Sequence, residues 1–157
     1  MTRQTALLRT VLVAVLIGML VGAGLLYLAS MESATNWPTL AHLRIPVFVL
    51  VVLAFIPLVG VDILGFRFLR LVDHGDVFSE ATVTTLRRMR LLFAVFTAYV
   101  ALGLVAFWAV TGLMQLVLLL AWVGVALVGL AGYTTMALFE HVFTEATTLR
   151  QDNELTV

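Results

Sequence analysis

The chain contains four apolar stretches, each long enough to cross a lipid bilayer as a helix. They cover about residues 8–29, 45–66, 91–110 and 113–139. The hydrocarbon core of a bilayer is about 30 Å thick, which a helix of about 20 apolar residues spans. The composition, 62% apolar and 11% charged, excludes an ordinary soluble domain, in which about a quarter of the residues are charged. Only Thr111 and Gly112 separate the last two stretches, which predicts a tight hairpin between them.

The predicted fold is therefore an all-α integral membrane protein, with residues 1–157 forming a single membrane domain. Its four transmembrane helices form an antiparallel bundle. Pro57 lies inside the second span and is expected to kink it, because proline cannot donate a backbone hydrogen bond.

The arginines indicate how the bundle lies in the membrane. Eight of the nine arginines lie before the first span, between the second and third spans, or after the fourth; Arg44 is the exception. Positively charged loops stay in the cytoplasm, so we expect both termini, residues 67–90 and residues 140–157 there. Five of these arginines are interpreted as residues that set the topology and bind anionic lipid headgroups: Arg67, Arg70, Arg87, Arg88 and Arg90.

Residues 67–90 are predicted to form a helical hairpin that extends from the second and third spans into the cytoplasm. Gly75 is placed to end the first arm in a left-handed conformation. Ser79 is a good N-cap, so the second arm is expected to begin at Glu80. The tip is acidic, with Asp73, Asp76 and Glu80. Two interpretations of these acids stay open, solvated turn residues and contacts to a protein partner.

The segment LRLVDHGDVFSEATVTTLRRMR resembles the signature of a bacterial four-span membrane protein family, domain of unknown function 2975. The resemblance rests on Leu71, Asp73, Gly75, Phe78, Ser79, Leu86 and Arg87, and on the ending LRQDNELTV over residues 149–157. It implies a bacterial inner-membrane protein with no assigned activity, cofactor or catalytic residue. Because members are often encoded beside a small helix-turn-helix regulator, it also implies a membrane-bound partner or antagonist of such a regulator.

The residues expected to bind this cytoplasmic partner come from the hairpin and the C-terminal segment. Their acids would engage the basic DNA-binding face of the regulator, without direct contact between this protein and nucleic acid. The candidates are Asp73, Asp76, Phe78, Ser79, Glu80, Asp152 and Glu154.

Asp62 is the one acid inside a predicted span. Acids within membrane helices are expensive and often functional, but Asp62 lies about one turn from the cytoplasmic end of its span. We expect an ion pair with Arg67 or Arg90. The alternative is a coupling or proton-carrying role in a small transporter or channel subunit, for which Thr97, Gln115, Thr134 and Thr135 are the few other polar candidates in the spans.

Ala14, Gly18 and Gly22 recur at four-residue spacing in the first span. Small residues allow membrane helices to approach closely. The stripe is expected to pack within the bundle, and the alternative is a homodimer. An immunity or envelope-stress protein that acts by contact within the membrane would also use this face.

Signs of catalysis or of a bound cofactor are weak. The chain has no cysteine, and its histidines are scattered. Glu140, His141 and Glu145 cluster beyond the fourth span, but two potential ligands at four-residue spacing make a weak metal site. We expect a non-enzymatic protein without a metal, cofactor or catalytic residue.

Overall fold

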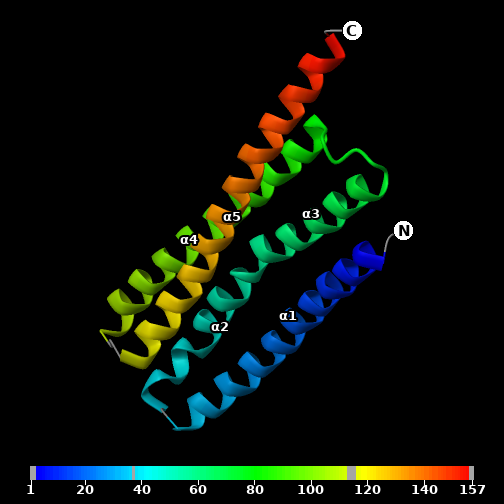
Figure 1. The fold of residues 1–157 in the computed structure, drawn as a ribbon. Helices are drawn as coiled ribbons and strands as arrows, with labels where there is room; N and C mark the ends of the chain where they lie inside the picture. The colour runs from blue at the N-terminus through cyan, green and yellow to red at the C-terminus, as the bar shows by residue number, and fades with distance from the viewer. Residues whose placement is uncertain (1–2, 37, 113–115, 156–157) are drawn as a thin grey trace.

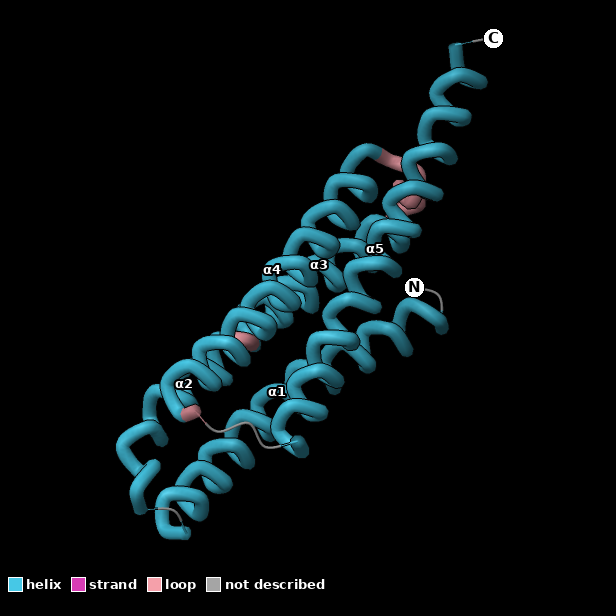
Figure 2. The backbone as a smooth tube through the Cα atoms, turned by 90° about the vertical axis from the view of Figure 1, so that its left-hand side faces the viewer, coloured by secondary structure: helices cyan, strands magenta, loops and turns pink. Residues whose placement is uncertain are grey.

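The computed structural model describes residues 3–36, 38–112 and 116–155. Its elements are α1 (Arg3–Asn36), the 3-10 helix η1 (Pro38–Leu43), α2 (Arg44–Leu53), α3 (Phe55–Asp73), α4 (Glu80–Thr111) and α5 (Leu116–Leu155). In Figure 1 the chain runs along α1, returns through α2 and α3, and then runs along α4 and back along α5. Figure 2 shows the same elongated stack from the side, with short turns between the helices.

Four helical stretches of the described chain are long and apolar enough to cross a membrane: Thr5–Glu32, Ala41–Asp73, Glu80–Thr111 and Leu119–Leu149. The predicted helical membrane protein is therefore confirmed at this level. The predicted fourth span began at residue 113, but residues 113–115 lie outside the described chain. Residues 140–155, expected as a separate tail, continue α5 as one helix.

The second membrane stretch is broken at Ala54, one turn before Pro57. Proline has no N–H to donate to the carbonyl four residues earlier, which ends α2 at Leu53. The N–H of Ala54 donates to the carbonyl of Val51 at 3.2 Å, which leaves the Leu50 carbonyl without its usual helical donor. The Tyr99 hydroxyl of α4 donates to that carbonyl at 2.8 Å. The expected kink is thus present, and a neighbouring helix satisfies the backbone group that it frees.

The turn between α3 and α4 has the predicted caps. Gly75 adopts a φ of +79°. Its N–H donates to the Val72 carbonyl, while the N–H of Asp76 donates to the Leu71 carbonyl, which together form a Schellman motif. The Ser79 side chain accepts a hydrogen bond from the Thr82 N–H at 3.3 Å, and α4 begins at Glu80. We call this end of the molecule the hairpin end; Figure 1 shows the start of α1 and the last part of α5 there too.

Helices α4 and α5 share the most extensive contact of any two elements in the described fold. Glycines on each helix make room for large side chains of the other: Gly103 faces Trp122, Gly129 faces Phe96, and Gly132 faces Phe93. The paired residues are equally distant from the turn at Gly112, whose φ of +63° ends α4. The turn therefore sets the register of the two helices along their shared length.

Helix α1 packs on the outside of α2 and α3. Its Leu12 fits against Gly65, where an added Cβ would lie 3.1 Å from the leucine side chain. Ala14 is exposed, and nothing lies within 4 Å of a Cβ placed on Gly18 or Gly22. The expectation that this stripe packs within the bundle is therefore wrong: Leu12 faces α3, while Gly18 and Gly22 lie outside that contact.

Candidate functional site

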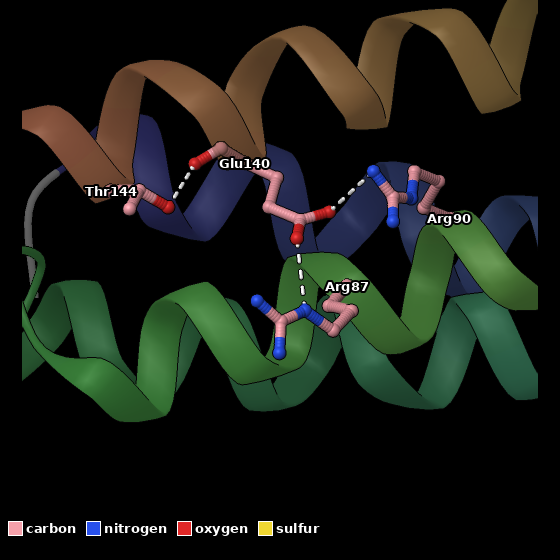
Figure 3. Close-up of polar contacts among 4 residues, drawn as sticks. All are labelled: Arg87, Arg90, Glu140 and Thr144. Atoms are coloured by element: carbon pink, nitrogen blue, oxygen red, sulfur yellow. Dashed lines mark hydrogen bonds and ion pairs between the residues drawn. The ribbon is translucent and has the colours of Figure 1, made fainter.

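A buried acid connects α4 and α5 near the hairpin end. The Glu140 side chain on α5 is 10% exposed. Arg87 Nε donates to its Oε1 at 2.9 Å, and Arg90 Nη1 lies 3.1 Å from its Oε2 as an ion pair that lacks hydrogen-bond geometry (Figure 3). The Thr144 hydroxyl, one turn further along α5, donates to the Glu140 carbonyl at 2.6 Å. We call Arg87, Arg90 and Glu140 the Glu140 cluster.

The register of α4 and α5 explains this cluster. Arg87 and Arg90 are three residues apart and therefore share one face of α4. Glu140 is nearly as far beyond the Gly112 turn as these arginines are before it, so it meets them across the helix pair. Arg90 also lies over the Tyr133 ring at 5.9 Å, an attractive cation–π arrangement.

Sequence reasoning missed the Glu140 cluster. It assigned Arg87 and Arg90 to lipid headgroups together with Arg67, Arg70 and Arg88. The structure corrects this for Arg87 and Arg90, whose charges face an acid of the same chain. Counting outward from the tight turn at Thr111 and Gly112 would have placed Glu140 opposite this part of α4. The position of this turn was therefore the sequence signal from which the Glu140 cluster could have been predicted.

Beside the Glu140 cluster, residues of α4 and α5 line an open hollow of about 290 Å³. We call it the threonine groove, and it is lined by Glu80, Val83, Thr84, Arg87, Thr144, Thr147 and Thr148. The hydroxyls of Thr144, Thr147 and Thr148 donate to backbone carbonyls of α5 at 2.6, 2.7 and 3.0 Å. Since their protons are used within the helix, these hydroxyls offer acceptor lone pairs to anything else that they contact.

The five hairpin residues predicted for partner binding divide into two groups. Three have structural tasks: Asp73 pairs with Arg9 at 2.7 Å, Phe78 stacks on Phe143 at a centroid distance of 5.8 Å, and Ser79 caps α4. The remaining hairpin acids, Asp76 and Glu80, are exposed. Neither forms an ion pair within the described chain.

Asp152 and Glu154 lie on the last turns of α5, and their side chains are outside the described part of the structure. Figures 1 and 2 both show these turns extending past the α3–α4 turn. The C-terminal segment therefore projects as a helix beyond the end of the bundle.

Asp62 lies in α3 with 3% of its surface exposed, and its Oδ2 has no hydrogen-bond partner among the described residues. The expected ion pair with Arg67 or Arg90 is not formed. Arg90 is held by Glu140, and Arg67 lies five residues further along α3, about 140° around the helix from Asp62. His141 and Glu145 form an exposed pair at 3.3 Å.

Comparison with protein families gives a match over residues 27–157 to the family described as "Protein of unknown function (DUF2975)". The chain belongs to this family. The matched part of this DUF2975 protein includes the end of α1 and all the later elements, so it contains both the Glu140 cluster and the threonine groove. Comparisons with curated proteins and with solved structures gave no match.

Proposed function

We propose that this DUF2975 protein is a non-enzymatic protein of the bacterial inner membrane that binds a small cytoplasmic helix-turn-helix regulator, as its partner or antagonist. Its four spans form an antiparallel bundle, and the hairpin end lies in the cytoplasm. The observation that carries the proposal is the threonine groove, which lies at the same end as Asp76 and Glu80, two acids that form no ion pair within the described chain.

The charge distribution supports this orientation. Arg9, Arg67, Arg70 and the arginines of α4 all belong to the hairpin end, whereas Arg44 starts α2 at the opposite end. Arg44 donates to the Ser30 hydroxyl at 3.3 Å and lies 5.3 Å from the Tyr27 ring. The cytoplasmic side of a membrane protein carries the excess of arginine and lysine.

The groove supports a partner with a basic, donor-rich surface. Three of its threonine hydroxyls already donate hydrogen bonds within α5, so their oxygens can accept hydrogen bonds from a partner. Glu80 adds a carboxylate. Arg87 is paired with Glu140, whose single negative charge it shares with Arg90. Arginine and lysine side chains are pure donors, and they are the residues with which DNA-binding proteins contact phosphates. A regulator that is bound here through such residues could not bind DNA with them at the same time.

The test is affinity purification of the tagged full-length protein from native membranes. Two substitutions remove the hydroxyls but keep the side-chain shape, Thr144→Val and Thr148→Val. Thr134→Val is the matched control, because that hydroxyl also donates within α5 but lies outside the groove. We expect the wild type and T134V to recover a helix-turn-helix protein that T144V/T148V loses, and added salt should weaken the binding. Identical eluates from all three proteins would contradict the proposal.

Asp62 favours a second candidate, a small transporter or channel subunit. The buried Asp62 Oδ2 has no hydrogen-bond partner among the described residues, and such an acid in a membrane helix is a functional hypothesis in its own right. The other polar candidates are weaker. Thr97 and Thr134 donate to carbonyls of their own helices, Thr135 is exposed, and Gln115 lies outside the described residues. Asp62→Asn should abolish flux if this function is correct and should leave regulator binding unchanged.

A third candidate uses the face formed by Ala14, Gly18 and Gly22, as an immunity or envelope-stress protein or as a homodimer would. The open space beside Gly18 and Gly22 favours it, because another helix could approach there closely. Gly18→Leu should then abolish function and dimer crosslinking, whereas substitutions in the threonine groove should change neither.

A further inference from the structure

A second basic surface lies on α3, away from the Glu140 cluster. A shallow hollow of about 390 Å³ runs along this helix. It is lined by Ile63, Phe66, Arg67, Arg70, Leu71 and His74. We call it the α3 hollow.

The basic residues of the α3 hollow have no partner in the described chain. Arg67 and Arg70 are exposed, and neither has an ion pair or a hydrogen bond from its side chain among the described residues. They differ in this from Arg87 and Arg90, which face Glu140, and from Arg9, which binds Asp73. Two guanidinium groups are therefore available to an anion from outside the chain.

Two apolar residues of the hollow, Ile63 and Phe66, lie on the membrane side of the basic ones, whereas Leu71 follows Arg70. Ile63 is 60% exposed although it sits in the middle of α3. With a rise of about 1.5 Å per residue, Arg67 lies about 6 Å and Arg70 about 10 Å beyond Ile63 toward the hairpin end. His74 follows at the C-cap of α3. Toward the hairpin end, the apolar surface is thus followed by the hydrogen-bond donors of Arg67, Arg70 and His74.

We propose that the α3 hollow binds one anionic phospholipid. Its phosphate accepts hydrogen bonds from Arg67 and Arg70, and its headgroup reaches His74, while an acyl chain covers Ile63 and Phe66. Guanidinium groups bind phosphate oxygens in pairs of parallel hydrogen bonds, which favours this headgroup over a zwitterionic one whose own ammonium compensates the phosphate. The exposed Ile63 favours a lipid over a soluble phosphate, because a free anion would leave the apolar part of the hollow uncovered.

The test uses the full-length protein, purified in detergent and mixed with phosphatidylglycerol and phosphatidylcholine in equal amounts, with the bound lipid counted by native mass spectrometry. The variant is Arg67→Gln with Arg70→Gln. The control is Arg44→Gln, which removes the arginine at the start of α2, at the opposite end of the bundle and outside the hollow. We expect wild type and R44Q to retain phosphatidylglycerol selectively and R67Q/R70Q to bind it about tenfold more weakly.

Three results would overturn the proposal. In the first, the wild type retains the two lipids equally. This result can be interpreted from the wild type alone. In the second, R67Q/R70Q and R44Q lose phosphatidylglycerol to the same extent, which would show that the lipid does not depend on the arginines of the α3 hollow. In the third, inorganic phosphate displaces the lipid completely from the wild type, which would make the hollow a site for a soluble anion. Because the threonine groove lies on α4 and α5, none of these results bears on the regulator.

Discussion

Arg87 on α4 donates its Nε to Oε1 of Glu140 on α5 across 2.9 Å, which joins residues 53 positions apart in the sequence. The acid is buried, whereas the arginine side chain is 67% exposed. Burial therefore removes the carboxylate of Glu140 from water, which is unfavourable, and the attraction of Arg87 and Arg90 offsets this free energy. Arg87 also lines the threonine groove, so its contact with Glu140 connects the packing of the hairpin end to the proposed binding surface.

Replacing the buried acid should destabilise the protein. Glu140→Gln removes the charge that Arg87 and Arg90 face, and we expect a loss of about 2 kcal/mol in unfolding free energy. The measurement is thermal or denaturant unfolding of the full-length protein in detergent. Glu145→Gln is the control, because its pair with His141 is exposed and worth little. Equal stabilities of E140Q and E145Q would refute the role assigned to Glu140.

Removing the Tyr99 hydroxyl should weaken the junction between α2 and α3. Tyr99→Phe leaves the Leu50 carbonyl without the donor that replaces its helical one, at an expected cost of about 1–2 kcal/mol. Tyr133→Phe is the matched control, since it keeps the ring that lies beneath Arg90. Unfolding measurements that rank the two variants equally would show that the break at Ala54 needs no donor from α4.

Adding one methyl group to the α4–α5 interface should be costly where the helices are closest. Gly129→Ala places a Cβ against the Thr97 hydroxyl and about 2.8 Å from the Phe96 ring, and such overpacking costs about 1–3 kcal/mol. Gly124→Ala on the same helix has open space around it and should be neutral or slightly stabilising. Both are measured by unfolding in detergent. Equal stability of the two variants would contradict the register set by the Gly112 turn.

The orientation can be tested by cysteine labelling, because the natural chain contains no cysteine. Thr148→Cys at the hairpin end should be protected from a membrane-impermeant maleimide in intact cells and labelled once the cells are opened. Ala41→Cys at the opposite end should be labelled in intact cells. The reverse pattern would place the hairpin end outside the cytoplasm and would remove the basis of the proposed function.

The local features of this fold could be predicted from sequence, because each depends on a few adjacent residues. Hydropathy locates the spans, Gly75 and Ser79 locate the α3–α4 turn, and Pro57 locates the break near Ala54. These signals act through backbone conformation and hydrogen bonding within one or two turns, so no knowledge of the packing is needed.

The faces of the helices could not be predicted in the same way. Lipid and a neighbouring helix are equally apolar, so a span does not need a polar side toward its surroundings, and its pattern does not reveal its inner face. This is why Gly18 and Gly22 were expected inside the bundle. The partners of Asp73 and Glu140 were missed for a related reason, because both contacts depend on the register between helices.

The central claim is that the threonine groove and the acids beside it hold a basic regulator, and site-specific photo-crosslinking in living cells tests it most directly. A crosslinker at position 148 should capture a helix-turn-helix protein. Glu80→Gln should reduce the yield severalfold, whereas Asp73→Asn should not, because Asp73 is engaged by Arg9. Position 134, outside the groove, should give no such product. An equal yield from positions 148 and 134, or no helix-turn-helix protein at either, would contradict the claim.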